Sequence, residues 1–527
     1  MSDTVQCPAS GAGPTRWAWR SPKGRFILFM IALTALYAAG LNSYWRFQRD
    51  SVLYMGLGRS LAETGTYSFN YRPHIFVWPG FPAMLSLVYM TLGESFLAMN
   101  ALISVFGLGA VAVACLLFRE VRLSERETVA CALMYGLSRT LYYYSSHIMP
   151  DVPFSFFVLV GLYCGVRMVR TAGRASWLWT VGAAASGAAA LFVRPLGPAL
   201  LIALGAGLWL RRGALRQWTW NLGRTALIAA PVALAGGLWL LRCAQVRGPH
   251  DSGYFYRFVA AGPVVRTVVR MVSSVPALVE SLPDALLGVD LGMAVGLLLA
   301  LVAAVGFLGG VRRGESLLCS YGLVYLGAVC LGSPGRRYLL PALPVLIVWL
   351  VRGAATIGGR LGRLWQPLSG RRLALAGRVL LGLALAVNTV RIGKVVYQAR
   401  SPRFYEVTEG RTLLDYFALA EWLRDNARPD DLVLAYESRF LHYFTYPRCV
   451  RTLDSEWMQR LRGTREAADA LKQMGVTLYV SDPGKQQREG PLRRLVKSSP
   501  EAFRPVGQFG SLALVRVRAR NLRTGDP

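Results

Sequence analysis

Acidic residues, histidines and paired cysteines are scarce in this 527-residue chain, and each scarcity narrows its class. Asp and Glu number 29 against 59 Lys and Arg, which gives a formal net charge of +30. Only four histidines occur, and none of the eight cysteines forms a CxxC pair, so no zinc-finger spacing is present. The sequence also lacks GxxxxGK[ST] and GxGxxG, so no recognisable nucleotide-binding loop is present.

Apolar residues are abundant: they make up 54% of the chain, in long runs that are nearly free of charge. The mean hydropathy is +0.36. This composition predicts a polytopic α-helical membrane protein, because lipid-exposed backbone must satisfy its hydrogen bonds within helices. Most arginines cluster in short loops between the apolar runs. That is typical of topology signals and of contacts with membrane lipids, and it argues against nucleic acid as a partner.

Eleven apolar runs predict membrane spans, and the charges of the loops between them predict an orientation. Alternate loops carry Arg clusters on the side of the basic N-terminal segment 1–25, which the positive-inside rule places in the cytoplasm of a cell with an inner membrane. Residues 26–391 would form the membrane domain. An odd number of spans would then place residues 392–527 outside the cytoplasm. The predicted spans are 26–42, 95–118, 128–145, 153–168, 176–192, 196–210, 222–242, 291–310, 316–331, 338–352 and 373–391.

Two cysteines, Cys243 and Cys449, would lie on the outer side in this topology. A disulfide between them is one option, although the sequence alone does not set their separation.

The first outer loop, 43–94, is long and rich in aromatic residues, and long ordered loops are usually functional. Within it, residues 50–63 repeat apolar side chains at helical spacing, which predicts an amphipathic helix at the membrane interface. Residues 77–93 predict a second surface or half-buried helix that starts near Pro82. This loop is therefore expected to form part of a site at the membrane surface.

Two aspartates stand out because residues 1–400 contain only thirteen acidic residues. Asp50 follows the first span and Asp151 precedes the fourth, so both fall at the outer membrane edge. Charges at this depth are costly and tend to mark function. Either aspartate could instead serve only to cap the helix that follows it. Side by side, they would form a candidate active site at the lipid–water boundary.

Three outer arginines depart from the positive-inside pattern, namely Arg194, Arg336 and Arg337. A single outer arginine usually extends to lipid head groups, which is the simple interpretation of each. Several of them beside two aspartates instead indicate a phosphate site. An extracytoplasmic transferase would take its sugar from a lipid-phosphate donor, which calls for a base at the acceptor hydroxyl and positive charge at the leaving phosphate.

The C-terminal part alternates helix and strand patterns and holds sixteen acidic residues after residue 400. It therefore predicts a small extracytoplasmic α/β domain. Helices are expected at Thr412–Asn426 and Thr464–Met474, and strands at Leu432–Ala435, Val476–Ser481 and 511–517.

Several short motifs, in this order and on these sides of the membrane, resemble the C-type superfamily of membrane glycosyltransferases. Within it, the chain resembles the bacterial branch related to protein O-mannosyltransferases and lipid A aminoarabinose transferases. The resemblance covers nearly the whole chain. Its motifs are RDSVLY (49–54), WPGFPAMLSLVY (78–89), HIMPDVPFSFF (147–157), VRPLGPALL (193–201), RRYLLPALP (336–344) and EWLRDNARPDDLVLA (421–435).

The resemblance implies roles for individual residues. Asp50 matches the family's first-loop catalytic aspartate, and Asp151 its second outer acidic position. Arg336 or Arg337 matches the arginine before Tyr338 in the late motif, where donor phosphate would bind. Independently of the resemblance, stacking on an aromatic residue would hold the sugar, which makes Tyr54 a candidate substrate contact.

The match departs from the family in the first loop. The family often has Asp-Glu where this chain has Asp50-Ser51, and often Lys before Pro-Pro where Arg72, His74 and Trp78-Pro79 stand here. Arg72 is therefore a candidate substrate contact. A divalent metal stays open as a cofactor, with His74 and His147 as weak candidate ligands that could equally be polar edge residues.

These observations together predict a glycosyltransferase of the extracytoplasmic face. It would move a sugar from a polyprenyl-phosphate donor to a hydroxyl of a glycan, lipid or protein acceptor, with inversion. Two rivals from other classes are a transporter or flippase and a non-catalytic envelope assembly factor. Transporters place ionisable groups near mid-membrane on broken helices, often in repeats, and no internal repeat is visible here.

Overall fold

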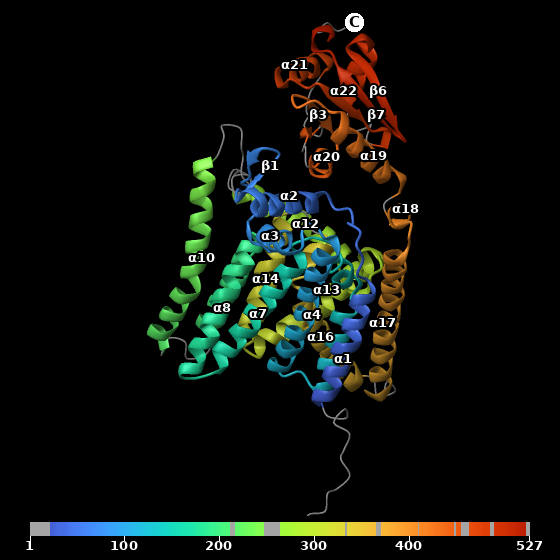
Figure 1. Ribbon diagram of the computed structural model, residues 1–527. Helices are drawn as coiled ribbons and strands as arrows, with labels where there is room; N and C mark the ends of the chain where they lie inside the picture. Colours follow the sequence, from blue (N-terminus) through green and yellow to red (C-terminus); the bar gives the residue numbers. More distant parts are fainter. Residues whose placement is uncertain are drawn as a thin grey trace, which may run out of the picture.

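The computed structural model contains a bundle of apolar helices and a C-terminal α/β domain that lies above one end of the bundle (Figure 1). The predicted fold class is confirmed. The structure describes residues 22–210, 217–246, 264–332, 335–364, 370–408, 410–446, 450–454, 463–484 and 490–522.

Seven helices of the described chain are long and apolar enough to cross a membrane. They are α4 (Phe96–Glu120), α7 (Asp151–Arg170), α8 (Arg174–Val193), α10 (Trp218–Val246), α13 (Gly292–Arg312), α16 (Leu343–Leu364) and α17 (Gly370–Arg400). Four shorter helices are also apolar, namely α1 (Pro22–Ala39), α3 (Gly80–Leu92), α9 (Pro198–Trp209) and α14 (Ser316–Leu331). Helix α17 continues past residue 391, so the predicted boundary between the domains falls within it.

The predicted span at 128–145 is not one helix. It consists of α5 (Glu125–Gly136) and α6 (Arg139–Tyr144). Ser138 begins α6 as its N-cap, and its hydroxyl accepts a hydrogen bond from the amide of Leu141. The same hydroxyl donates to the carbonyl of Ala285 in α12 (Val264–Leu287), a helix that the sequence did not predict. A polar side chain thus ends one helix and starts the next where α12 packs against the bundle.

Helices α13 and α16 approach each other closely because two glycines face the partner backbone. A Cβ atom on Gly306 would overlap the carbonyl of Trp349, and one on Gly353 would overlap the carbonyl of Val302. Small residues allow such contact between apolar helices, whose association within a membrane relies on close packing.

The first outer loop lies between the bundle and the α/β domain (Figure 1). Its helix α2 (Arg49–Thr64) confirms the amphipathic helix expected at 50–63, and α3 starts at Gly80, close to the expected Pro82. A two-stranded antiparallel hairpin, β1 (Ser68–Phe69) and β2 (Arg72–Pro73), connects the two helices. This loop therefore forms an ordered layer and not a spacer.

The C-terminal domain has a five-stranded sheet in the order β4-β3-β5-β7-β6. Strands β3, β4 and β5 pair in parallel, and β7 pairs antiparallel with both β5 and β6. The expected helices and strands are confirmed, whereas β4, β6, α20 and α22 were not predicted. The elements are α18 (Phe404–Thr408), α19 (Arg411–Asn426), β3 (Leu432–Ala435), α20 (Ser438–Phe444), β4 (Arg451–Asp454), α21 (Thr464–Met474), β5 (Leu478–Ser481), α22 (Gly490–Ser498), β6 (Phe503–Phe509) and β7 (Leu512–Val517).

Helix α20 anchors this domain on the first outer loop. The Tyr443 hydroxyl donates a 2.6 Å hydrogen bond to Glu94, and the same carboxylate pairs at 2.6 Å with Arg59 of α2. The Arg59 guanidinium lies 4.1 Å from the centroid of the Tyr443 ring. Trp45, which is fully buried, packs against Phe444 at 5.3 Å between ring centroids. Buried aromatic and charged contacts therefore hold the α/β domain over α2.

Candidate active site

Asp151 and Arg194 form a buried ion pair at the junction of two antiparallel spans. Asp151 lies in the first turn of α7, and Arg194 directly follows the last residue of α8. Their side chains are 2% and 11% exposed, and Arg194 Nη2 lies 2.8 Å from Asp151 Oδ2. The Nε atom of Arg194 is buried and has no hydrogen-bond partner in the described structure. A bound anion would satisfy this unpaired donor.

Asp50 occupies the first turn of α2 and is more accessible than Asp151, with 42% of its side chain exposed. Arg337 lies 3.6 Å from one carboxylate oxygen, and Arg439 of α20 lies 3.4 Å from the other. These distances are long for charge-assisted hydrogen bonds, so the carboxylate is held in position but not enclosed.

Neither carboxylate caps its helix, which had been the simple interpretation of both. The N-cap of α2 is Gln48 and the N-cap of α7 is Pro150, and neither makes a side-chain capping hydrogen bond. Asp50 and Asp151 instead pair with arginines from other elements.

Tyr338, Tyr54 and Arg337 connect the two carboxylates. Arg337 Nη2 donates a 2.6 Å hydrogen bond to the Tyr338 hydroxyl and interacts electrostatically with both Asp50 and Asp151. Tyr54 projects from α2 among the same charges. Burial raises the pKa of Tyr54 well above its usual value, so its phenol stays protonated and can donate a hydrogen bond. Asp50, Asp151, Tyr54, Arg194, Arg337 and Tyr338 therefore form one cluster.

Arg336 points into a different cluster from its neighbour Arg337. It pairs with Asp284 of α12 at 3.0 Å, and Arg139 pairs with the same carboxylate at 3.3 Å. Its guanidinium also lies 5.3 Å from the centroid of the Tyr143 ring. Of the two arginines that the late motif left open, Arg337 therefore lies beside the aspartates.

Arg72 does not join the cluster in the described structure. It lies in β2, whose two residues are exposed, and no described contact connects it with Asp50 or Asp151. The neighbouring residue Asn70 accepts and donates hydrogen bonds at Thr452 of β4. The hairpin thus serves as a contact with the α/β domain, and a substrate role for Arg72 stays a prediction without structural support.

The two histidines proposed as weak metal candidates occupy separate positions, and His147 is buried whereas His74 is half-buried. His147 is 1% exposed, and its Nδ1 lies 2.6 Å from the carbonyl oxygen of Tyr143. His74 packs between Tyr67 and Phe76. No group of three metal-ligating side chains occurs among the residues that the structure describes. Because arginines lie beside both aspartates, the described residues of this cluster do not fit a divalent cation site.

A small basic pocket of about 200 Å³ adjoins the Arg336 cluster on the same side of the bundle as Asp50. It is lined by Tyr143 and His147 together with residues from α17 and the segment before α2. Its cationic lining residues are Arg46, Arg139, Arg391 and Lys394. The membrane edge beside the candidate site is thus positively charged, as a phosphate-bearing substrate requires.

Sequence reasoning missed three residues of these clusters, namely Arg139, Asp284 and Arg439. Arg439 contacts Asp50 across 389 positions of the chain, and no sequence signal marked it. Asp284 could have been found, since it is one of the few acidic residues near the outer edge. Cys449 lies outside the described residues, so its pairing with Cys243 stays a prediction.

His74 yields a prediction about acid stability. Burial lowers its pKa from 6.5 to about 3, helped by the positive charges of Arg439 and Arg242. The unfolded chain binds a proton below pH 6.5 that the folded chain does not, so stability falls as the pH drops from about 6.5 towards 3. Between pH 7 and pH 5, the wild type should therefore lose roughly 2 kcal/mol more of its free energy of unfolding than the His74→Phe variant. Thermal unfolding of both proteins at the two pH values measures this, and equal losses would contradict it.

Comparisons with known proteins agree with the fold. A family model described as dolichyl-phosphate-mannose-protein mannosyltransferase matches residues 86–239. Solved structures of membrane glycosyltransferases share the fold over most of this chain, so the resemblance seen in the sequence is confirmed at the level of the fold. A comparison with curated protein sequences gave no significant match.

Three solved structures illustrate the likeness. ArnT from Cupriavidus metallidurans, bound to undecaprenyl phosphate, superposes with a TM-score of 0.58 at 14% identity, covering 94% of this chain and 98% of its own. The oligosaccharyltransferase AglB from Archaeoglobus fulgidus was solved in complex with an inhibitory peptide and a dolichol-phosphate. It superposes with a TM-score of 0.56 at 12% identity, and the match covers 88% of this chain and 70% of AglB. The arabinofuranosyltransferase AftD from Mycobacteria superposes with a TM-score of 0.51 at 15% identity, and the match covers 93% of this chain and 41% of AftD.

Proposed function

We propose that this protein transfers a sugar from a polyprenyl-phosphate donor to an acceptor hydroxyl at the membrane face that carries Asp50 and Asp151. The observation that carries the proposal is the arrangement of one accessible carboxylate beside guanidinium groups. Asp50 is 42% exposed and lies 3.6 Å from Arg337. The partly unpaired guanidinium of Arg194 interacts with the same cluster.

The roles follow from accessibility. Asp50 is accessible enough to take the proton of an acceptor hydroxyl, as a general base must. The acceptor oxygen attacks the anomeric carbon while the bond from that carbon to the phosphate oxygen breaks. The bonding electrons pass to the phosphate, whose growing charge Arg337 and Arg194 stabilise. One such displacement inverts the anomeric centre.

Asp151 is a positioning residue in this scheme. Its side chain is only 2% exposed, and its charge is matched by Arg194 at 2.8 Å. It holds that guanidinium at the site and offsets its charge in part. The phenol of Tyr54, which stays protonated, supplies a hydrogen-bond donor to the phosphate or the sugar.

The donor class is supported by the ligands of the similar structures. ArnT was solved with undecaprenyl phosphate and AglB with a dolichol-phosphate. This chain shares their fold and places Arg194 and Arg337 beside its two aspartates. We extend the same carrier chemistry to it, with a glycan, lipid or protein as acceptor.

The proposed location is the inner membrane, with residues 392–527 outside the cytoplasm. Arginines at the ends of α4, α7 and α13 lie on the face opposite to Asp50, as the positive-inside rule requires of the cytoplasmic side. The α/β domain then covers the outer site, where Arg439 reaches Asp50. That placement suits a role in covering the site or choosing the acceptor.

A donor panel tests this function directly. Purified full-length protein in detergent would be incubated with radiolabelled polyprenyl-phosphate sugars, with total envelope extract as the source of acceptor. We expect label from one sugar to move to an acceptor, or slowly to water. The contrary result would be that no donor supports transfer while unlabelled lipid-linked substrate crosses the membrane of proteoliposomes only when the protein is present. The protein would then be a flippase and not a transferase.

A further inference from the structure

A cavity of about 750 Å³ lies at the end of the helix bundle remote from Asp50 and Asp151. Its wall is formed where α4, α7 and α13 end and where α14 begins, together with one turn of α16. The site described above uses none of these residues. The cavity is therefore a separate feature of the opposite membrane face.

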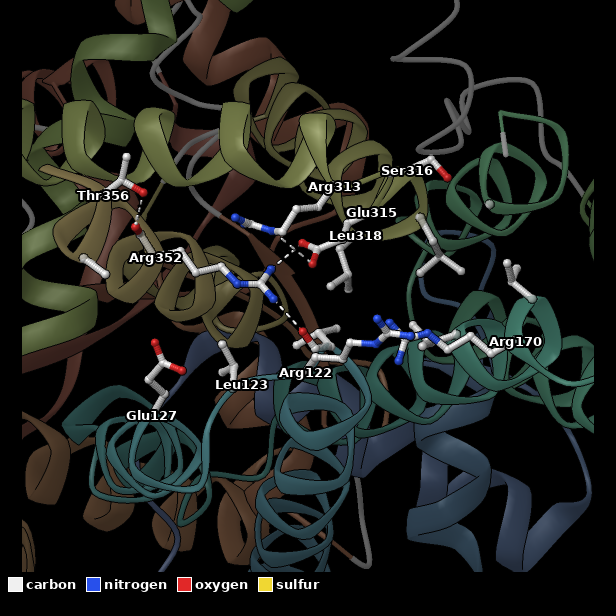
Figure 2. Close-up of a pocket in the computed structure, with 17 residues that line it drawn as sticks. Arg122, Leu123, Glu127, Arg170, Arg313, Glu315, Ser316, Leu318, Arg352 and Thr356 are labelled. Carbon is white, nitrogen blue, oxygen red and sulfur yellow. Dashed lines mark hydrogen bonds and ion pairs between the residues drawn. The ribbon is translucent and has the colours of Figure 1, made fainter. Parts of the chain in front are cut away.

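Four arginines converge on this cavity from four elements, as Figure 2 shows. They are Arg122, Arg170, Arg313 and Arg352. Two glutamates, Glu127 and Glu315, also line it, so the positive charges exceed the negative ones by two. Arginines that only determine topology are expected to extend separately towards water or lipid head groups.

The glutamates are already engaged. Glu315 pairs with the largely buried Arg352 and lies 3.5 Å from Arg313. Glu127 accepts a hydrogen bond from the amide of Ser124 in the capping box of α5. Within the described structure, no carboxylate of the wall forms an ion pair with Arg122, and Arg170 pairs with Glu120, which lies outside the wall, at 3.6 Å.

Arg122 and Arg170 extend towards each other across the cavity (Figure 2). They are close enough for their charges to repel. Such an arrangement is stable when an anion lies between the two groups. Phosphate accepts hydrogen bonds from several guanidinium groups at once and carries up to two negative charges near neutral pH, which equals the excess here.

The backbone of Arg122 gives a second, independent indication. Its φ is +60°, in the left-handed region, and it follows Val121, the C-cap of α4. Glycine is favoured at this position after a helix because it has no Cβ, and a long side chain there costs free energy. The arginine thus occupies a position where the fold alone would favour glycine.

We propose that this cavity binds a phosphate group, held mainly by Arg122 and Arg170. Apolar side chains on the wall, including Val166 and Leu318, suit a phosphate that carries an apolar substituent. Two sources share this chemistry: the head group of an anionic lipid in the adjoining leaflet, and a soluble phosphate compound.

Thermal unfolding of the full-length protein in detergent tests the proposal. One arm adds dioctanoyl phosphatidic acid against dioctanoyl phosphatidylcholine, and the other adds inorganic phosphate against chloride at equal ionic strength. The variants are Arg122→Gly and Arg170→Gln. Arg126→Gln is the matched control, because it removes one exposed arginine from α5, near the cavity but outside its lining.

We expect at least one phosphate probe to raise the Tm of the wild type and of Arg126→Gln by several degrees. In Arg122→Gly and Arg170→Gln the rise should shrink by at least half. A response to phosphatidic acid alone would identify the ligand as a lipid. Responses to both phosphatidic acid and inorganic phosphate would show that the cavity binds phosphate groups in general.

Arg122→Gly separates binding from structure. Glycine relieves the left-handed backbone, so without a probe its Tm should equal or exceed that of the wild type. Equal responses in all four proteins, or no response to either probe in the wild type, would overturn the proposal. If Arg122→Gly does not fold, the comparison of Arg170→Gln with Arg126→Gln decides alone.

Discussion

Replacing Asp50 with Asn should reduce sugar transfer about 10²- to 10⁴-fold, the usual contribution of a general base. The amide keeps the shape of the carboxylate but cannot accept the proton of the acceptor hydroxyl. Because Asp50 is 42% exposed, the substitution should change thermal stability little. The measurement is the initial rate of label transfer from the donor identified in the panel, at saturating donor.

The matched control for Asp50 is Glu63→Gln. Glu63 lies on the same helix α2, is exposed, and is not part of the cluster of ion pairs. Its neutralisation changes the charge of α2 equally and should leave the rate within about twofold, as expected of surface substitutions. If Asp50→Asn retained the wild-type rate, Asp50 would not be the base, and the proposed mechanism would fail.

Replacing Arg194 with Met should destabilise the protein strongly, by about 3–5 kcal/mol, because it leaves the carboxylate of Asp151 buried and unpaired. The pair is 2.8 Å long, and both side chains are almost fully buried. It also joins the start of α7 to the end of α8, two helices that pack along each other. Thermal unfolding in detergent measures the loss, with transfer activity followed on the folded fraction.

A double variant separates the structural role of this pair from its chemical role. Asp151→Asn combined with Arg194→Met removes both charges, so stability should recover by at least half of the single-variant loss. Transfer should not recover, because the guanidinium that faces the leaving phosphate is still missing. Recovery of both properties would mean that Arg194 has only a structural role.

The sequence was sufficient to find the candidate acids but not to assign the arginines. Asp50 and Asp151 stood out because acids are rare in the apolar part of the chain. The adjacent pair Arg336-Arg337 remained ambiguous in the late motif. In α15 (Arg336–Leu339) these neighbours are about 100° apart around the helix axis, as successive residues of a helix are. One side chain therefore reaches Asp284 and the other reaches Asp50.

Neither the helix break at Ser138 nor the helix α12 could be predicted from the sequence, for a similar reason. Residues 128–145 are apolar enough for one span. The hydroxyl of Ser138, however, finds a partner in the carbonyl of Ala285, 147 positions away. Local patterns report which segments avoid water, and they carry no information about which distant polar group will meet a given side chain.

By itself, the sequence determined the membrane class, most of the helices and the α/β character of the C-terminal part. The physical reason is that a bilayer forces long apolar runs into helices and that local periodicity marks amphipathic elements. Only the tertiary structure decided that Arg337 and not Arg336 joins the aspartates and that Arg439 reaches Asp50 from the α/β domain. It alone also showed that four arginines from separate elements line one cavity. Contacts between distant segments depend on packing, which no local pattern encodes.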